Sequence, residues 1–228
     1  MRTVTTHQMS ELRRLSFRDG GFVSIEDGWQ QKVADTVDVV VVNAANVSRL
    51  YYKDAYDTNR TAMPMCWSAT TQTPDEGVPM SDRQSVRCMD CEKNIRGSGG
   101  RLNSRACRFV QRLAVVLDGQ FDTVYQLQLS ATSIFGRGKN NNKPLQEYAK
   151  FLGGRGTKII SVVTRIYVDS FSDFPRLCFK PVRSLTPSEL NSVSELKVDP
   201  VTLQAIDRSR AIITSPFSVE CGFDHKKL

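Results

Sequence analysis

The strongest pattern in this chain is a strict alternation of apolar and polar side chains, which is the period of a β-strand. It is clearest over 158–170, where one face comprises Ile160, Val162, Thr164, Ile166 and Val168. Residues 175–182 alternate in the same way after a short turn, so the two segments are predicted to pair as an antiparallel hairpin. Residues 108–119 and 124–133 are likewise predicted to be strands of a half-exposed sheet.

Strands are also indicated in the first quarter of the chain. Two strand-like runs within 18–42 are bounded by glycine and aspartate, which favour turns. The run 37–42 is apolar except for Asp38, which predicts a strand buried on both faces. Tyr51 and Tyr52 follow in another extended segment, and neighbouring side chains of a strand point to opposite faces. One tyrosine is therefore expected in the core and the other at the surface.

Three short helices are predicted in the second half. Apolar residues recur at helical spacing over 145–152, and the glycines within 153–156 end that helix. Thr186 and Glu189 have the spacing of a capping box at the start of a second helix. Asp199 precedes a proline in the same way and predicts a third helix after it.

Between these patterned regions, residues 63–107 show no sustained period of either kind and are rich in Pro, Gly, Ser, Asp and Arg. Such a long irregular stretch inside a compact domain needs something else to order it. The sequence therefore predicts a mainly β (α+β) domain over 18–185 with an insertion at 63–107, followed by a short helical segment and tail at 186–228.

Cysteines could order this insertion. Four of the six cysteines fall within it, at a spacing of Cys-x21-Cys-x2-Cys-x15-Cys: Cys66, Cys88, Cys91 and Cys107. A Cys-x2-Cys pair places two thiolates within reach of one zinc, and two further cysteines can complete a structural site. Alternatively, the outer two cysteines are ordinary buried thiols and the close pair is chance. Cys178 and Cys221 are interpreted as ordinary thiols, and the only histidines, His7 and His225, lie near the termini.

The insertion also concentrates positive charge. The chain carries 31 Lys and Arg against 24 Asp and Glu, a net charge of +7 with a pI near 9.2. Within 83–112 the acidic residues are Asp90 and Glu92, and the eight basic residues are Arg83, Arg87, Lys93, Arg96, Arg101, Arg105, Arg108 and Arg112. Phosphate binding is one use of such a surface. The alternative is a solvated face that neutralises four zinc-bound thiolates.

The same segment has a recognisable order of motifs. Cys-x-Ser precedes a proline, Cys-x2-Cys is followed by Asn and Gly-Ser, and a last cysteine precedes Arg-Leu-Ala. The positions concerned are Cys66, Ser68, Pro74, Cys88, Cys91, Asn94, Gly97, Ser98, Cys107, Arg112, Leu113 and Ala114. This order resembles a family of tailed-bacteriophage single-stranded-DNA-binding proteins, with weaker similarity over roughly 18–185. The resemblance implies an oligonucleotide/oligosaccharide-binding (OB) barrel with a structural zinc loop. The chain departs from replicative single-strand-binding proteins in ending SVECGFDHKKL rather than in an acidic tail.

Single-strand binding needs cations that track phosphates and exposed aromatic rings on which bases stack. The candidate rings are Tyr51, Tyr52, Trp67 and Tyr167, and the candidate cations are Lys93, Arg96, Arg101, Arg105, Arg165, Arg176 and Lys180. Alternation along the hairpin predicts that Arg165 and Tyr167 share its polar face with Arg176 and Lys180. Each ring could instead be core, and the polar face could simply be solvated.

These features favour a non-enzymatic single-stranded-DNA-binding protein acting in phage replication, recombination or transcription, in the cytoplasm of the infected bacterial host. Other phage replication or transcription proteins are the expected protein partners. The alternative is a zinc-containing phage transcription regulator that binds promoter DNA or RNA polymerase. A zinc nuclease or phosphoryl-transfer enzyme is disfavoured because the chain has no HExxH motif or acidic cluster. The sequence GRGK at 136–139 does not match a nucleotide-binding P-loop either. The longest apolar run is far below the roughly 18 residues of a membrane span.

Overall fold

The computed structural model describes residues 12–53, 63–100, 103–138, 142–169, 172 and 175–207. Its strands are β1 (Arg14–Arg18), β2 (Gly21–Glu26), β3 (Trp29–Ala34), β4 (Val37–Ala44), β5 (Ser48–Tyr51), β6 (Cys66–Ser68), β7 (Cys107–Leu117), β8 (Gln120–Ser130), β9 (Val162–Val168) and β10 (Leu177–Ser184). Within these residues, no helix has both the length and the apolar character needed to cross a membrane.

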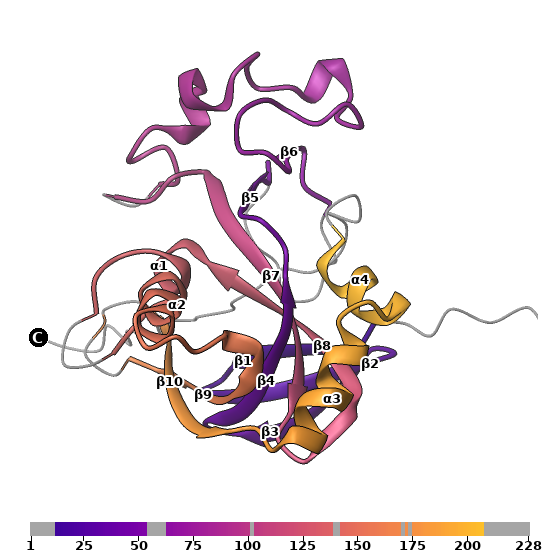
Figure 1. Cartoon of the computed structure of the whole chain (residues 1–228). Coiled ribbons are helices and arrows are strands. Elements are labelled where there is room, and N and C mark those ends of the chain that lie inside the picture. The colour runs from indigo at the N-terminus through magenta and orange to yellow at the C-terminus, as the bar shows by residue number, and fades with distance from the viewer. Residues whose placement is uncertain are drawn as a thin grey trace, which may run out of the picture.

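The strands form one curled, open sheet in the order β10-β9-β4-β7-β8-β1-β2-β3 (Figure 1). β5 pairs with β7 beside this path, and β6 pairs with β5. Neighbouring strands are antiparallel except β1 and β8, which are parallel. The predicted mainly β fold is confirmed. In the described residues the sheet is open, because β10 and β3 lie at opposite ends of the path.

Four short α-helices accompany the sheet in the described residues: α1 (Ala131–Ile134), α2 (Leu145–Gly153), α3 (Pro187–Leu196) and α4 (Pro200–Ile206). The predicted capping box of α3 is present: the Glu189 amide donates to the Thr186 hydroxyl at 3.3 Å, and the Thr186 amide donates to the Glu189 carboxylate at 2.8 Å. The Asp199 carboxylate accepts from the Val201 amide at the start of α4, also as predicted.

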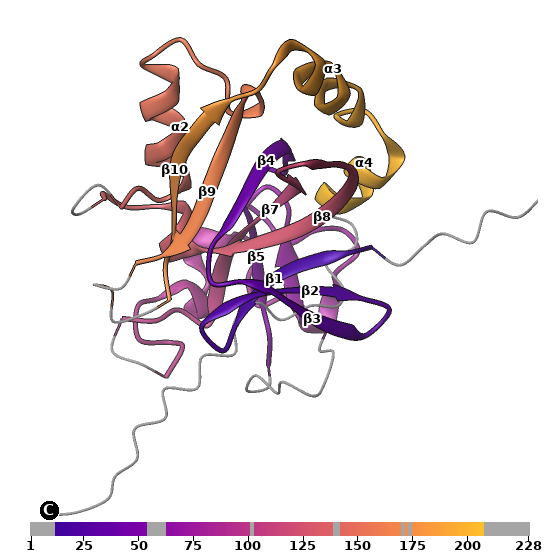
Figure 2. The ribbon, with the colours of Figure 1, turned by 90° about the horizontal axis from the view of Figure 1, so that it is seen from below.

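The central strand β4 is buried on both faces, as its apolar run predicts, because each face of the sheet is covered by different helices. Val39 and Val41 belong to a core that α2 completes, whereas Val40 and Val42 belong to a second core completed by α3 and α4. Figure 2 shows α2 apart from α3 and α4, with β9 and β10 between them. The C-terminal helices therefore share the core of the sheet, and the predicted boundary at 185/186 falls between β10 and α3.

The predicted hairpin at 158–182 is present as β9 and β10, and Leu177 pairs with Val168 at its end. Its first strand begins later than predicted. Residues Ile159–Ser161 form a 3-10 turn, because the Ser161 amide and hydroxyl both donate to the Lys158 carbonyl at 3.0 and 2.8 Å.

The segment predicted to be irregular contains β6 and three 3-10 turns, η1 (Met80–Asp82), η2 (Cys88–Asp90) and η3 (Glu92–Asn94). It projects beyond the sheet at the top of Figure 1, attached through β5 and the first residues of β7. Backbone hydrogen bonds within the segment stabilise it locally. Asp75 donates to Trp67 at 3.0 Å, and Gly97 donates to Ser104 at 2.8 Å.

Candidate metal and nucleic-acid site

The four cysteines predicted to bind zinc line one small cavity in the projecting segment. The cavity has a volume of about 20 Å³ and is lined by Tyr51, Cys66, Pro74, Gln84, Ser85, Cys88, Cys91, Lys93 and Cys107. Space of this size accommodates a single water-sized guest. Cys66, Cys88 and Cys91 are buried, Cys107 is half-buried, and all four are free thiols. Cysteines up to 41 residues apart in the chain thus line the same cavity.

Strand register explains how the outer two cysteines reach this cavity. Tyr51 on β5 is the pairing partner of Cys66 on β6 and also of Cys107 on β7. Residues directly opposite one another in a sheet point to the same face. The two thiols therefore flank the tyrosine on one face of this three-stranded extension.

The inner two cysteines bracket the turn η2: Cys88 begins it, and Cys91 directly follows it. The Cys88 amide donates to the Gln72 carbonyl at 2.7 Å, which ties η2 to the start of the segment. The Cys91 carbonyl accepts from the Asn94 amide at 2.8 Å, which closes the next turn. A Cys-x2-Cys turn held from both sides can present both thiols to the same cavity.

The surroundings of the thiols include both apolar walls and hydrogen-bond donors. Burial raises the pKa of Cys66, and it raises the pKa of Cys107 to about 11. The Gln84 backbone near Cys66 and the Arg49 guanidinium near Cys107 act in the opposite direction, lowering the thiol pKa and favouring the thiolate.

The donor set fits zinc, which prefers four cysteine thiolates in structural sites. The cavity does not, however, preset a tetrahedron. Across the part of the chain that the structure describes, no three His, Cys, Asp or Glu side chains are grouped as metal ligands. Cys66 and Cys107 lie on the two strands that flank β5, and two strand spacings amount to about 10 Å. Because a zinc–sulfur bond is about 2.3 Å long, these two strands would have to approach each other for both thiolates to bind one zinc.

Arg49 is a buried cation near this cavity that sequence reasoning missed. Its side chain is 7% exposed, and its Nη1 donates to Asn94 Oδ1 at 2.6 Å. Its guanidinium carbon lies 4.0 Å from the centre of the Phe109 ring, and its Nε has no hydrogen-bond partner. Burying a guanidinium costs free energy, and nearby negative charge offsets that cost. Thiolates bound to a metal would supply that charge here.

Tyr51 lines the cavity and also lies beneath a cation. The Lys93 ammonium is 5.7 Å from the centre of the Tyr51 ring, within the range of a cation–π interaction. The ring is half-buried, so the expectation that one of the two tyrosines is core and the other surface is wrong. Tyr52 is also half-buried, because it packs against Leu50 and Val110.

The other predicted loop residues are placed less favourably for stacking. The Tyr52 hydroxyl is buried without a partner, and burial raises its pKa. Trp67 is half-buried against the same small cluster. Among the cations, Arg96 is exposed, whereas Arg105 is half-buried and donates to Asn94 at 3.4 Å. Arg101 lies outside the described residues.

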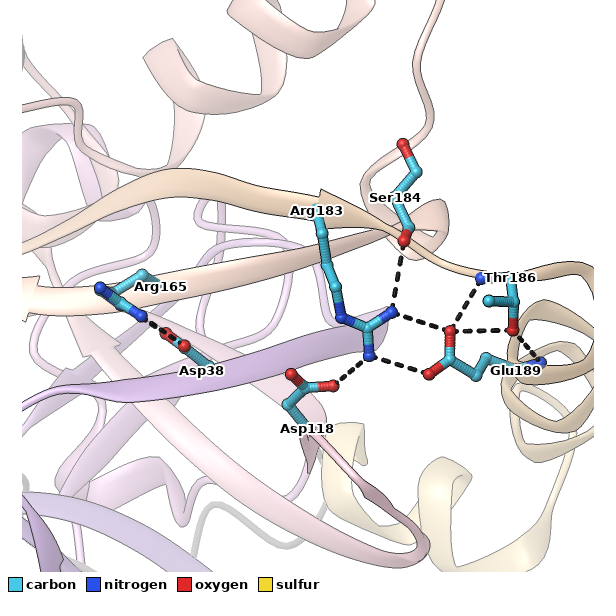
Figure 3. Close-up of polar contacts among 7 residues, drawn as sticks. All are labelled: Asp38, Asp118, Arg165, Arg183, Ser184, Thr186 and Glu189. Atoms are coloured by element: carbon cyan, nitrogen blue, oxygen red, sulfur yellow. Dashed lines mark hydrogen bonds and ion pairs between the residues drawn. The ribbon is translucent and has the colours of Figure 1, made fainter.

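On the hairpin, the register places Arg165 opposite Lys180 and Tyr167 opposite Cys178, so Arg165, Tyr167 and Lys180 share one face. Arg176, which was predicted to share this face, precedes β10 and has no place in the strand register. Arg165 is already engaged, since Nε and Nη2 bond Asp38 at 2.7 and 2.6 Å (Figure 3). The Lys180 ammonium lies 5.2 Å from the centre of the Tyr167 ring.

Arg176 is tied into the loop at the end of the hairpin. It donates to the Arg137 carbonyl at 2.9 Å and lies 4.0 Å from the Asp169 carboxylate. Its side chain is 16% exposed. Strand order separates the two groups of candidates: the hairpin is at the β10 end of the path, and the cysteine segment is attached to β7.

Comparisons of the chain with protein-family models, with curated proteins and with solved structures gave no match. The resemblance to bacteriophage single-stranded-DNA-binding proteins therefore rests on the sequence motifs and stays a prediction.

Proposed function

We propose that this protein is a non-enzymatic single-stranded-DNA-binding protein whose projecting segment is stabilised by structural zinc. The observation that carries the proposal is the position of Tyr51, which lines the cavity with all four cysteines and lies beneath Lys93. The four cysteines, an aromatic ring and a cation thus lie around the same cavity. Stacking on a ring and contact of a cation with phosphate are the two interactions that sequence-tolerant single-strand binding requires.

Zinc would be held by Cys66, Cys88, Cys91 and Cys107, with Arg49 balancing the charge of the thiolates. Structural zinc contributes folding free energy on the order of 10 kcal/mol in small domains. Such a contribution would stabilise a segment that has few apolar contacts of its own, since its small apolar cluster centres on Leu50 and Val110.

At this site, a base would stack on the Tyr51 ring while Lys93 moves from the ring to the neighbouring phosphate. Tyr167 with Lys180 repeats the same ring-and-cation pair on the hairpin. The exposed Arg96 adds a further phosphate contact. Each phosphate neutralised releases counterions, so binding weakens with salt by about 0.7 log units of affinity per log unit of salt.

We further propose that the curled sheet is a variant of the OB barrel and that the protein serves phage replication, recombination or transcription in the bacterial host cytoplasm. Support for this comes from the order of sequence motifs and from the mainly β fold.

The test is a fluorescence-anisotropy titration of labelled single-stranded and duplex oligonucleotides at two salt concentrations. We expect a preference for single strands, a salt-dependent affinity, and about tenfold weaker binding in Tyr51→Ala, because stacking contributes about 1 to 3 kcal/mol per base. Lys93→Ala should weaken binding and reduce the salt dependence. Lys158→Ala is the matched control, because Lys158 is exposed on the turn before β9, away from the cysteines.

Equal loss of affinity in Lys158→Ala would mean that only net charge matters and would refute the site. A clear preference for duplex DNA would instead support a promoter-binding transcription regulator.

A further inference from the structure

The strand β3 forms a free edge of the sheet. It lies at the end of the strand path, and in the described residues its partner is β2 alone. All residues from Trp29 to Val33 are exposed. The opposite edge is covered, because Phe179 on β10 donates to the Lys143 carbonyl at 2.9 Å. Among the residues that the structure describes, one sheet edge is thus covered and the other is open.

The turn before β3 fixes which backbone groups face outward. Asp27 and Gly28 have φ values of 48° and 83°, as in the two-residue type I′ turn of β-hairpins. In such a hairpin the residues that flank the turn, Glu26 and Trp29, exchange both backbone hydrogen bonds. Farther along the two strands, pairs without hydrogen bonds alternate with hydrogen-bonded pairs. The N–H and C=O groups of Gln30 and Lys32 therefore point away from β2, toward the free edge.

Two large apolar side chains on this strand are exposed. Trp29 is 83% exposed and Val33 is 37% exposed. Tryptophan is largely buried on average, and exposed apolar groups along a free strand edge mark interaction sites. A bulge at Val33 ends the regular ladder with β2, since Val23 pairs with Lys32 and the preceding Phe22 pairs with Ala34.

Charge argues that the occupant of this edge is not nucleic acid. Residues 12–35 carry four basic and four acidic side chains, whereas the whole chain has a net charge of +7. Two of these basic residues are paired, Arg13 with Glu26 at 2.6 Å and Lys32 with Asp35 at 3.1 Å. Two copies of this basic protein can approach each other here without net repulsion.

We propose that β3 pairs antiparallel with β3 of a second copy of this chain, with the two-fold axis at Gln31. This register places Gln30 opposite Lys32 of the other copy, so the outward backbone groups of each strand meet those of its partner. It also places Trp29 next to the other copy's Val33, and it brings Lys32 opposite a neutral amide rather than a like charge. The balanced local charge, together with a register that pairs Trp29 with Val33 and keeps the two Lys32 side chains apart, favours a second copy as the occupant.

A single strand pair buries less than the roughly 1,200 Å² typical of stable interfaces, so the dimer is weak and depends on concentration. The test is sedimentation equilibrium of the full chain over a wide concentration range, without nucleic acid. A second readout uses Trp67→Phe, in which Trp29 is the sole remaining tryptophan of two. Burial of Trp29 should shift its fluorescence emission to shorter wavelength as the concentration rises.

Lys32→Pro removes one outward N–H, which the ladder with β2 does not use, and Trp29→Ala removes the apolar contact. We expect both variants to remain monomeric and to retain the wild-type melting profile. Val198→Ala is the control, because Val198 is 75% exposed between α3 and α4, and it should dimerise as the wild type does. A wild-type protein that is monomeric at all concentrations, or a folded Lys32→Pro variant that dimerises normally, would overturn the proposal. Neither outcome bears on single-strand binding.

Discussion

Replacing Arg49 with methionine tests whether the cysteine cavity carries negative charge. The change keeps the length and apolar stem of the side chain and removes its charge and donors. The hydrogen bond to Asn94, at 2.6 Å, is charge-assisted and is worth about 1.5 to 3 kcal/mol. The contact with the Phe109 ring, at 4.0 Å, adds about 1 to 2 kcal/mol in a desolvated site. With a metal on the four cysteines, the free energy of unfolding should fall by about 3 kcal/mol.

Without negative charge on the thiols, the same substitution should not lower the free energy of unfolding. A buried guanidinium that lacks a counter-charge costs several kcal/mol, so its removal should then be neutral or stabilising. The assay is thermal and urea unfolding of wild type and Arg49→Met, each with zinc and after chelation. We expect a melting temperature lowered by about 10 °C in the zinc-loaded variant, since 1 kcal/mol corresponds to about 2 to 4 °C at this chain length. An Arg49→Met protein as stable as wild type in the presence of zinc would refute the reasoning.

Three further predictions concern the zinc ligands, the start of α3 and the hairpin. One zinc should bind per chain and be lost from the Cys88→Ser, Cys91→Ser double variant, whereas Cys178→Ser should retain it; elemental analysis that finds zinc kept in the double variant would contradict the ligand set. Hydrogen bonds from Arg183 and from the Thr186 amide lower the pKa of Glu189 to about 2 (Figure 3), below its ordinary value, so its stabilisation of α3 should be full above about pH 4 and lost as the pH falls toward 2. The melting temperature should therefore depend less on pH across this range in Glu189→Gln than in the wild type. An unchanged pH dependence in this variant would argue against the Arg183–Glu189 pair. Finally, Tyr167→Ala should weaken single-strand binding about tenfold without loss of zinc, and a stable variant with wild-type affinity would remove the hairpin face from the binding surface.

Much of the architecture could be predicted from local patterns. The burial of both faces of β4 follows from its run of apolar residues. The starts of α3 and α4 follow from capping residues that lie close in sequence to the amides they bind. The position of the four cysteines around one cavity was also predictable, because their spacing and the lack of periodic core in the surrounding segment both indicated it. Their binding of zinc stays a prediction.

Contacts between distant residues could not be predicted in this way. Arg165 was expected to be free on a polar face, but it pairs with Asp38, 127 positions away, because β4 and β9 are neighbours in register. Arg49 gave no signal, since a single arginine in a short strand is ordinarily solvated. Its burial depends on the turn η3, which brings Asn94 to it across 45 positions.

The most direct test of the link between the cysteine cavity and nucleic-acid binding is one titration performed in three states. A labelled single-stranded oligonucleotide is titrated with the full chain loaded with zinc, then after chelation, and then after zinc is restored. We predict salt-dependent binding that falls on chelation and returns with zinc, because Tyr51 and Lys93 line the same cavity as the four cysteines. Binding of equal affinity in all three states, or no single-strand binding by the zinc-loaded protein, would contradict a metal-stabilised binding segment.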